Sequence, residues 1–217
     1  MSLTLYAHPF SSYCQKVLIA LWEKEIVFAY RHLEEPGATR ELETLWPLAR
    51  FPLLVDDGRT VVESSIIIEH LDRHHAGPIR LLPDDDDFGL EVRFMDRFFD
   101  LYVMTAMQKP VFEALRAESD RKEEVLQEAH RALETAYGWL ETRLSGRTWA
   151  AGSGFTMADC AAAPSLFYAD WIHPISPDFP ILRDYRRRLL ARPSFARAVE
   201  EARPYRSYFP LGAPDRD

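Results

Sequence analysis

Cysteine is scarce in this sequence, which contains only Cys14 and Cys160 among its 217 residues. The two are far apart, and neither lies in a cluster with the spacing of metal ligands. The sequence therefore predicts neither a disulfide framework nor a cysteine-based metal centre. Such sparing use of cysteine is typical of proteins of the reducing cytoplasm.

Long apolar runs and an excess of positive charge are missing as well. No apolar segment approaches the roughly 20 residues needed to span a bilayer. The first ten residues lack the basic region, apolar core and cleavage site of a signal peptide. The formal net charge of -8 argues against a nucleic-acid partner, because phosphate binding requires a basic surface. We therefore expect a soluble, cytoplasmic protein that binds neither nucleic acid nor membrane.

Strand and helix patterns alternate over residues 1–77. An apolar strand at residues 3–7 is followed by an amphipathic helix. The apolar side chains of this helix recur at the spacing of one helical face: Cys14, Val17, Leu18, Leu21 and Trp22. A second strand is predicted at residues 26–33, and residues 37–45 are predicted to form a loop with a short helix.

The rest of this segment contains a predicted hairpin and a helix. Residues 53–55 and 60–62 are apolar and flank an Asp-Gly pair that favours a tight turn. A helix is then predicted to begin at Ser64. The order β-α-β followed by β-β-α predicts a small α/β domain whose first two strands pair in parallel.

The remainder of the chain is almost entirely helical in pattern. Residues 78–87 are rich in proline and aspartate and are predicted to be a linker, so that residues 88–217 form a second, all-α domain. In this domain Thr156 is predicted to be a helix N-cap. Asp159 stands three residues later, where its carboxylate can accept the N–H of the cap.

Ser11 lies between the first strand and the first helix, within the four residues S-S-Y-C. These resemble a thiol-redox C-x-x-C in which serine replaces the first cysteine. Free N–H groups converge at a helix start and suit a thiolate or another anion, although a serine there can also simply cap the helix. Cys14 lies on the apolar stripe of the helix and is expected to be a buried, unreactive side chain.

Histidines cluster at the end of the helix that begins at Ser64. His70 and His74 are four residues apart and lie on one helical face, and His75 follows them. Such a pair can bind a metal ion, but an exposed helix end without metal is the preferred interpretation. We expect no metal in this protein.

Taken together and in this order, the motifs resemble the glutathione transferase family over essentially the whole chain. The motifs that carry the resemblance are the serine-bearing loop, L-W-P-L-A-R-F-P-L-L-V-D-D-G, V-V-E-S-S-I-I-I-E-H-L and G-S-G-F-T-M-A-D. The resemblance implies a thioredoxin-like α/β N-terminal domain and an all-α C-terminal domain. It also implies glutathione as cosubstrate, a small-molecule electrophile as second substrate, and a homodimer.

The resemblance assigns roles to residues of the N-terminal half. Ser11 matches the catalytic serine of serine-type members, whereas Tyr6 is a competitor because other classes use a tyrosine near the end of this strand. A hydroxyl at position 11 can donate a hydrogen bond to the sulfur of bound glutathione, so that the nucleophile arrives with the cosubstrate. The residues that match glutathione contacts are Arg50, Phe51, the cis-proline position Pro52, Glu63 and Ser64.

The electrophile is expected between the two domains, where small-molecule sites commonly lie. The candidate wall consists of aromatic and sulfur-containing side chains, namely Phe10, Phe98, Tyr102, Met104, Met107 and Tyr208. The resulting hypothesis is a glutathione transferase that joins the glutathione sulfur to an electrophilic carbon. Two alternatives share the fold: a non-catalytic glutathione- or ligand-binding protein, and a glutathione-dependent isomerase or peroxidase.

Overall fold

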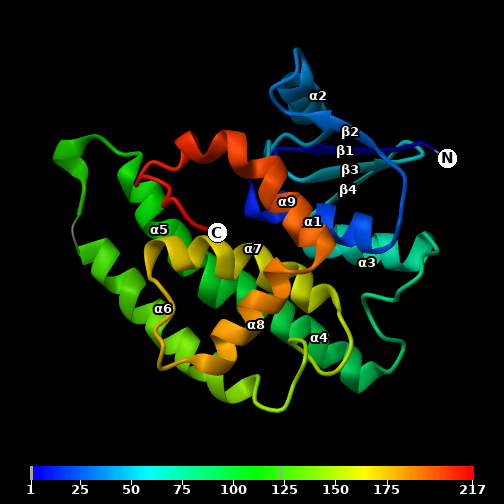
Figure 1. Cartoon of the computed structure of the whole chain (residues 1–217). Helices are drawn as coiled ribbons and strands as arrows, with labels where there is room; N and C mark the ends of the chain where they lie inside the picture. Colours follow the sequence, from blue (N-terminus) through cyan, green and yellow to red (C-terminus); the bar gives the residue numbers. More distant parts are fainter. Residues whose placement is uncertain (1, 123) are drawn as a thin grey trace.

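The computed structural model describes residues 2–122 and 124–217 and divides the chain into an α/β half and a helical half. In Figure 1 the sheet lies on one side of the molecule, and α1 (Ser12–Glu23) and α3 (Ser64–His74) lie between it and the helical half. Helix α2 (Ala38–Leu45) lies on the other side of the sheet. This arrangement confirms the predicted thioredoxin-like domain followed by an all-α domain.

The four strands of the described chain form one mixed sheet with the order β2-β1-β3-β4. Their bounds are Leu3–Ala7 for β1, Ala29–His32 for β2, Leu53–Asp56 for β3 and Arg59–Val62 for β4. The predicted parallel pairing of β1 with β2 is confirmed, and β3 runs antiparallel to both β1 and β4. Strand β2 is shorter than predicted because its pairing starts with Ala29 opposite Thr4, near the beginning of β1.

The tight turn between β3 and β4 follows the prediction. Asp57 and Gly58 have φ angles of 44° and 85°, the left-handed conformation that Asp-Gly hairpin turns require. The apolar stripe of α1 is also as predicted, since Cys14, Val17 and Leu21 are completely buried. Packing of this stripe fixes the direction of α1 and hence the position of its N-terminal end.

The helical half contains several elements after the linker. Their bounds are Asp86–Phe98 for α4, Phe99–Met104 for the π-helix η1, Thr105–Ala114 for α5, Glu118–Asp120 for the 3₁₀ turn η2, Glu124–Arg143 for α6, Met157–Ile172 for α7, Pro180–Leu190 for α8, Pro193–Ala202 for α9 and Arg203–Tyr208 for the 3₁₀ turn η3. No helix among the described residues combines the length and apolar character needed to cross a bilayer.

Helix α7 forms the centre of the helical half. It packs against α1 of the other half and against α4 and η1 of its own, and most of its side chains are buried. The predicted capping box is present at its start: Asp159 accepts the backbone N–H of Thr156 at 2.8 Å. The same carboxylate also accepts the N–H of Ala150 and the O–H of Tyr185. Asp159 therefore connects the beginning of α7 to the preceding loop and to α8.

A buried ion cluster joins the two halves. The Lys16 ammonium of α1 lies 2.6 Å from Asp96 and 2.8 Å from Asp100, and it donates to Ser65 at the start of α3. Arg97 adds a second positive charge beside both aspartates. The buried Lys16 is thus paired with carboxylates, as a buried charge requires, and the half-exposed Arg97 balances the second carboxylate. The cluster fixes α3 and α1 against the helical half.

Candidate active site

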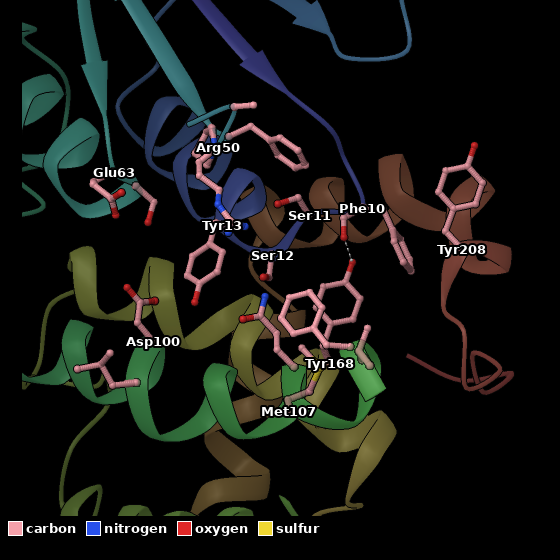
Figure 2. Close-up of a pocket in the computed structure, with 18 of the residues that line it drawn as sticks. Phe10, Ser11, Ser12, Tyr13, Arg50, Glu63, Asp100, Met107, Tyr168 and Tyr208 are labelled. Carbon is pink, nitrogen blue, oxygen red and sulfur yellow. Dashed lines mark hydrogen bonds between the residues drawn. The ribbon is translucent and has the colours of Figure 1, made fainter. Parts of the chain in front are cut away.

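A cleft of about 750 Å³ lies between the two halves. It is lined by the first turn of α1, the loop before β3, the start of α3, η1, α5 and the segment after α9. Its lining residues include Phe10, Ser11, Ser12, Tyr13, Arg50, Phe51, Pro52, Glu63, Ser64, Asp100, Met107, Tyr168 and Tyr208. Figure 2 shows side chains from both halves facing one another across this cleft.

Ser11 lies in the cleft at the N-cap of α1. Its Oγ accepts the backbone N–H of Cys14 at 3.4 Å, so the side chain caps the helix as one of the two sequence interpretations stated. A hydroxyl that accepts this bond still has its own O–H to donate. The capping and anion-stabilising interpretations are therefore compatible, because one side chain can do both at the positive end of α1.

The loop that precedes Ser11 is held from two sides. On one side, Tyr168 of α7 donates its O–H to the Phe10 carbonyl at 3.1 Å, as the dashed line in Figure 2 marks. Gln15 donates to the Pro9 carbonyl at 2.9 Å and to the Tyr168 hydroxyl at 3.0 Å. The helical half thus fixes the backbone on which Ser11 stands.

On the other side, His8 connects this loop to the C-terminal segment. Its Nδ1 accepts the N–H of Phe10 at 3.2 Å, and its Nε2 lies 3.2 Å from Glu34. Tyr208 donates its O–H to the same Glu34 carboxylate at 2.8 Å. Burial lowers the pKa of His8, which favours the neutral ring that this geometry uses. The segment around Tyr208 is thereby attached to the N-terminal half at the rim of the cleft.

The start of α3 forms a second helix N-terminus at the cleft. Glu63 is the N-cap residue and has a φ of 71°, a conformation that non-glycine residues rarely adopt. Its side chain makes no capping hydrogen bond, which leaves the first N–H groups of α3 to a ligand. The helix begins at Ser64, as the sequence predicted. Strained backbone of this kind is commonly found at functional sites.

The loop before β3 completes this part of the cleft. The Phe51–Pro52 peptide bond is cis, as the family resemblance implied. Arg50 and Phe51 are exposed, whereas Pro52 is buried beneath them. On the opposite side of the cleft from Arg50 lies Asp100, one of the two carboxylates of the ion cluster (Figure 2). Burial raises the pKa of Asp100, and the neighbouring Lys16 opposes this effect.

The structure separates Tyr6 from the cleft. The Tyr6 hydroxyl donates to Glu41 of α2 at 3.2 Å, and the side chain is not among the lining residues. Burial and the adjacent Glu41 carboxylate raise the pKa of the phenol. Of the two candidate hydroxyls, Ser11 lines the cleft and Tyr6 does not. Tyr13 does line the cleft, but burial raises the pKa of its phenol to about 12.

Three residues of the expected electrophile wall lie elsewhere. Met104 is 1% exposed and belongs to the core, and Phe98 stacks on Trp139 with ring centroids 4.2 Å apart. Tyr102 is 59% exposed and lies beside Phe98, outside the cleft lining. Tyr102 and Met104 lie within the π-helix η1, whose wider turn changes which side chains share a face, whereas Phe98 ends α4 and packs on Trp139 of α6. Phe10, Met107 and Tyr208 do line the cleft.

Several lining residues were missed by sequence reasoning. Ser12 and Tyr13 belong to the first turn of α1, and their position next to Ser11 could have indicated that they line the same site. Asp100 and Tyr168 approach from distant parts of the chain. No local pattern distinguishes them from the other polar side chains of their helices.

Comparison with known proteins identifies the family. Residues 5–79 match the glutathione S-transferase N-terminal domain, and residues 94–193 match the glutathione S-transferase C-terminal domain. The chain belongs to the glutathione S-transferase family. Members of this family use glutathione, and the two domains meet in this chain at the cleft that contains Ser11.

Individual relatives of this family member differ in what their names describe. This chain is 27% identical over 214 residues to a probable maleylacetoacetate isomerase of Vibrio cholerae, and the match covers 94% of this chain and 98% of the relative. It is also 27% identical to FtsZ-localized protein A of Caulobacter vibrioides, covering 88% of each. A solved Methylobacterium radiotolerans glutathione S-transferase, in complex with glutathione sulfonate, is 30% identical, with a TM-score of 0.77 and coverage of 92% and 95%.

Both cysteines of this transferase-family chain are buried, as predicted for Cys14. Burial raises the pKa of the Cys14 thiol to about 12, and burial likewise raises the pKa of Cys160. The Cys14 sulfur lies 3.5 Å from the backbone nitrogen of His8. A buried, protonated thiol is a poor nucleophile, so the Cys14 position favours a packing role over redox chemistry.

Replacing Cys14 with alanine is expected to lower the free energy of unfolding by about 1 kcal/mol, because a buried sulfur loses its contacts. Turnover with glutathione should stay within a few-fold of the unmodified protein. Thermal melting and initial rates of conjugation and of disulfide reduction check this. Loss of activity without loss of stability would instead place Cys14 in the chemistry.

Proposed function

We propose that the chain is a glutathione-dependent enzyme in which Ser11 stabilises the thiolate of bound glutathione for attack on an electrophilic carbon. The observation that carries the proposal is the placement of Ser11. Its hydroxyl lies at the N-terminus of α1, in the same cleft as the start of α3 and the cis-Pro52 loop.

The charges and backbone groups of the cleft match the parts of a glutathione molecule. The α-carboxylate of its γ-glutamyl end would be bound by Ser64 and the N–H groups that begin α3, with Glu63 beside it. The backbone of Phe51 would pair with the cysteinyl part, directed by the cis bond to Pro52. Arg50 would bind the glycyl carboxylate through charge-assisted hydrogen bonds.

The energy required of Ser11 is modest. Lowering a thiol pKa by two units takes about 2.7 kcal/mol of preference for the thiolate. A hydrogen bond to a charged group contributes about 1.5–3 kcal/mol, and a helix N-terminus contributes up to about 1 kcal/mol. One hydroxyl at the end of α1 is therefore sufficient, and no metal is needed.

The electrophile would occupy the side of the cleft nearest to Phe10, Met107 and Tyr208. Phe10 contacts Tyr168 edge to face, with centroids 5.5 Å apart, and Tyr208 forms the outer rim. These side chains supply apolar surface for a small molecule close to the Ser11 loop. We infer an apolar or aromatic small molecule as the second substrate.

A panel of substrates tests the reaction class. Reduced glutathione would be assayed with aryl halides, epoxides, α,β-unsaturated carbonyl compounds and organic hydroperoxides. The proposal predicts conjugation of at least one carbon electrophile. Glutathione binding without turnover of any substrate would contradict it and support a non-catalytic role. The similarity to FtsZ-localized protein A makes that outcome worth measuring.

A cis–trans isomerase is the second candidate, and the Vibrio cholerae relative favours it. Isomerisation begins with the same step, in which the thiolate adds to a conjugated carbon–carbon double bond. Rotation about the resulting single bond and loss of the thiolate then return free glutathione. Following a cis-configured unsaturated diketo acid by NMR distinguishes the two: an isomerase regenerates glutathione, whereas a transferase retains it in the product.

Replacing Ser64 with alanine is expected to weaken glutathione binding while leaving kcat little changed. Loss of one charge-assisted hydrogen bond costs about 1.5–3 kcal/mol, which corresponds to roughly a ten- to more than a hundredfold loss of affinity. Calorimetric titration with S-methyl glutathione measures this without turnover. Ser65→Ala, one residue away but directed to the ion cluster, is the matched comparison for effects on the helix. Unchanged affinity in Ser64→Ala would remove this residue from the site.

We also propose that the protein is a cytoplasmic homodimer, as the family resemblance implies. Exposed apolar side chains on α4, η1 and α6 offer surface for association: Leu90 is 65% exposed and Tyr102 59%, while Phe94 contacts the ring of Trp139. Light scattering at micromolar concentration should give twice the 25.1 kDa of one chain. A fully active monomer under these conditions would refute the dimer.

A further inference from the structure

Three potential metal ligands come together near the C-terminal end of α3, whereas the N-terminal end of this helix lies at the cleft. They are Asp56, the last residue of β3, His70 in α3, and His75, which caps the C-terminus of α3. The Asp56 Oδ2 atom lies 2.8 Å from Nε2 of His70 and 2.8 Å from Nε2 of His75. The three atoms all lie within 4.8 Å of one another.

The fold brings these residues together by packing α3 against the hairpin. Asp56 pairs with Arg59 across the turn between β3 and β4, which fixes the position of its carboxylate. The N–H of His75 bonds to the Leu71 carbonyl and ends the helix there. The negative end of the α3 dipole therefore faces this site and favours a cation.

The cluster is sheltered and has a defined geometry. The side chains of His70, His75 and Asp56 are 8%, 13% and 13% exposed. Both imidazoles point their Nε2 atoms at one carboxylate oxygen.

We propose that Asp56, His70 and His75 bind a divalent transition-metal ion of the Zn²⁺ type. Two imidazole nitrogens and one carboxylate oxygen are a common ligand set for such ions, with a fourth position left to water. In place of donating Nε2–H to Asp56, each imidazole would present the Nε2 lone pair to the metal and carry its remaining proton on Nδ1.

The required rearrangement is small. Metal–ligand distances of about 2.0–2.2 Å in a tetrahedral site separate neighbouring ligand atoms by about 3.4 Å. The observed nitrogen–oxygen distances of 2.8 Å would widen by about half an ångström, through side-chain rotation alone. The bound ion would connect the β3–β4 hairpin to the end of α3. It is a structural site, separate from the chemistry proposed for Ser11.

This set differs from the pair considered on sequence grounds. From helical spacing, His74 was the expected second ligand beside His70. In the structure His74 is exposed and does not belong to the cluster. Asp56 and His75 take its place. A second group within the described residues, His8, His32 and Glu34, also places three ligand atoms within 4.8 Å. It engages Phe10 and Tyr208 in hydrogen bonds, which metal binding would break.

Metal titration of the full-length protein tests the proposal. The protein would be stripped with a chelator, dialysed, and titrated with Co²⁺ followed by visible absorption, and with Zn²⁺ followed by calorimetry and thermal melting. We expect one ion per chain with a Kd on the order of 10 µM or tighter. We also expect d–d bands of a four- or five-coordinate Co²⁺ site, and a melting temperature that rises with Zn²⁺ concentration.

Variants locate the ion. His75→Ala and Asp56→Asn should each abolish the spectrum and the zinc-dependent rise in melting temperature, whereas His74→Ala and His32→Ala should keep both. Because the readout is the response to added metal, a lower melting temperature of the metal-free variant does not affect the comparison. If Asp56→Asn fails to fold, His75→Ala decides alone. No binding at 100 µM metal, or binding that survives His75→Ala or is lost in His32→Ala, would overturn the proposal.

Discussion

Replacing Ser11 with alanine is expected to lower kcat with reduced glutathione by at least about tenfold, a loss of about 1.4 kcal/mol of transition-state stabilisation. The hydroxyl lies at the N-terminus of α1, where it is placed to donate to the sulfur. Binding of S-methyl glutathione, which has no thiolate, should remain nearly unchanged. The effect should therefore appear in kcat and not in affinity for the thioether.

Stability must be measured beside activity, because Ser11 also caps α1. Loss of an N-cap costs about 1 kcal/mol, so Ser11→Ala should remain folded at the assay temperature. Ser11→Thr keeps a hydroxyl at this position and should retain more activity than Ser11→Ala. A silent Ser11→Ala together with a crippling Ser12→Ala or Tyr13→Phe would move the role to one of the neighbouring hydroxyls in the cleft.

Replacing Asp159 with alanine is expected to cost about 3–5 kcal/mol of unfolding free energy, a large part of the total stability of a typical protein. The carboxylate is completely buried and accepts bonds from the N–H of Ala150, the N–H of Thr156 and the O–H of Tyr185. Alanine would leave these donors buried and without partners, and each such group carries a penalty of about 1–3 kcal/mol.

Urea unfolding followed by circular dichroism measures this loss. Thr156→Ala removes only the N-cap side chain and should cost about 1 kcal/mol, which makes it the matched comparison. Asp159→Asn keeps one acceptor oxygen and should fall between the two. A loss below about 1 kcal/mol for Asp159→Ala would show that water or a shifted side chain satisfies the donors.

The features that the sequence predicted well are local ones. Apolar side chains such as Val17 and Leu21 recur at the spacing of one helical face, and burial of that face explains this spacing. Thr156 and Asp159 carry a capping signal within four residues, and the Asp-Gly pair specifies its turn through its backbone preferences. These patterns are readable because their physical cause acts between near neighbours.

The features that the sequence did not predict depend on distant contacts or on a local change of helical period. Tyr102 lies within the π-helix at residues 99–104, whose wider turn shifts the inward face, and Phe98 packs on the distant Trp139 instead of facing the cleft. Tyr168 reaches the Phe10 carbonyl across 158 residues of sequence. The position of Ser11 at a helix start was predicted from local sequence and its role from the family resemblance, but the loop contacts that hold it became visible only in the folded chain.

The pKa of bound glutathione tests the central claim most directly. The ultraviolet absorbance of the thiolate would be titrated with pH in the complex of glutathione with the unmodified protein and with Ser11→Ala. The account predicts a pKa about two units below that of free glutathione, equal to about 2.7 kcal/mol, and most of that shift should be lost in Ser11→Ala. Equal titration curves for the two proteins would contradict the assignment of Ser11 as the group that stabilises the thiolate.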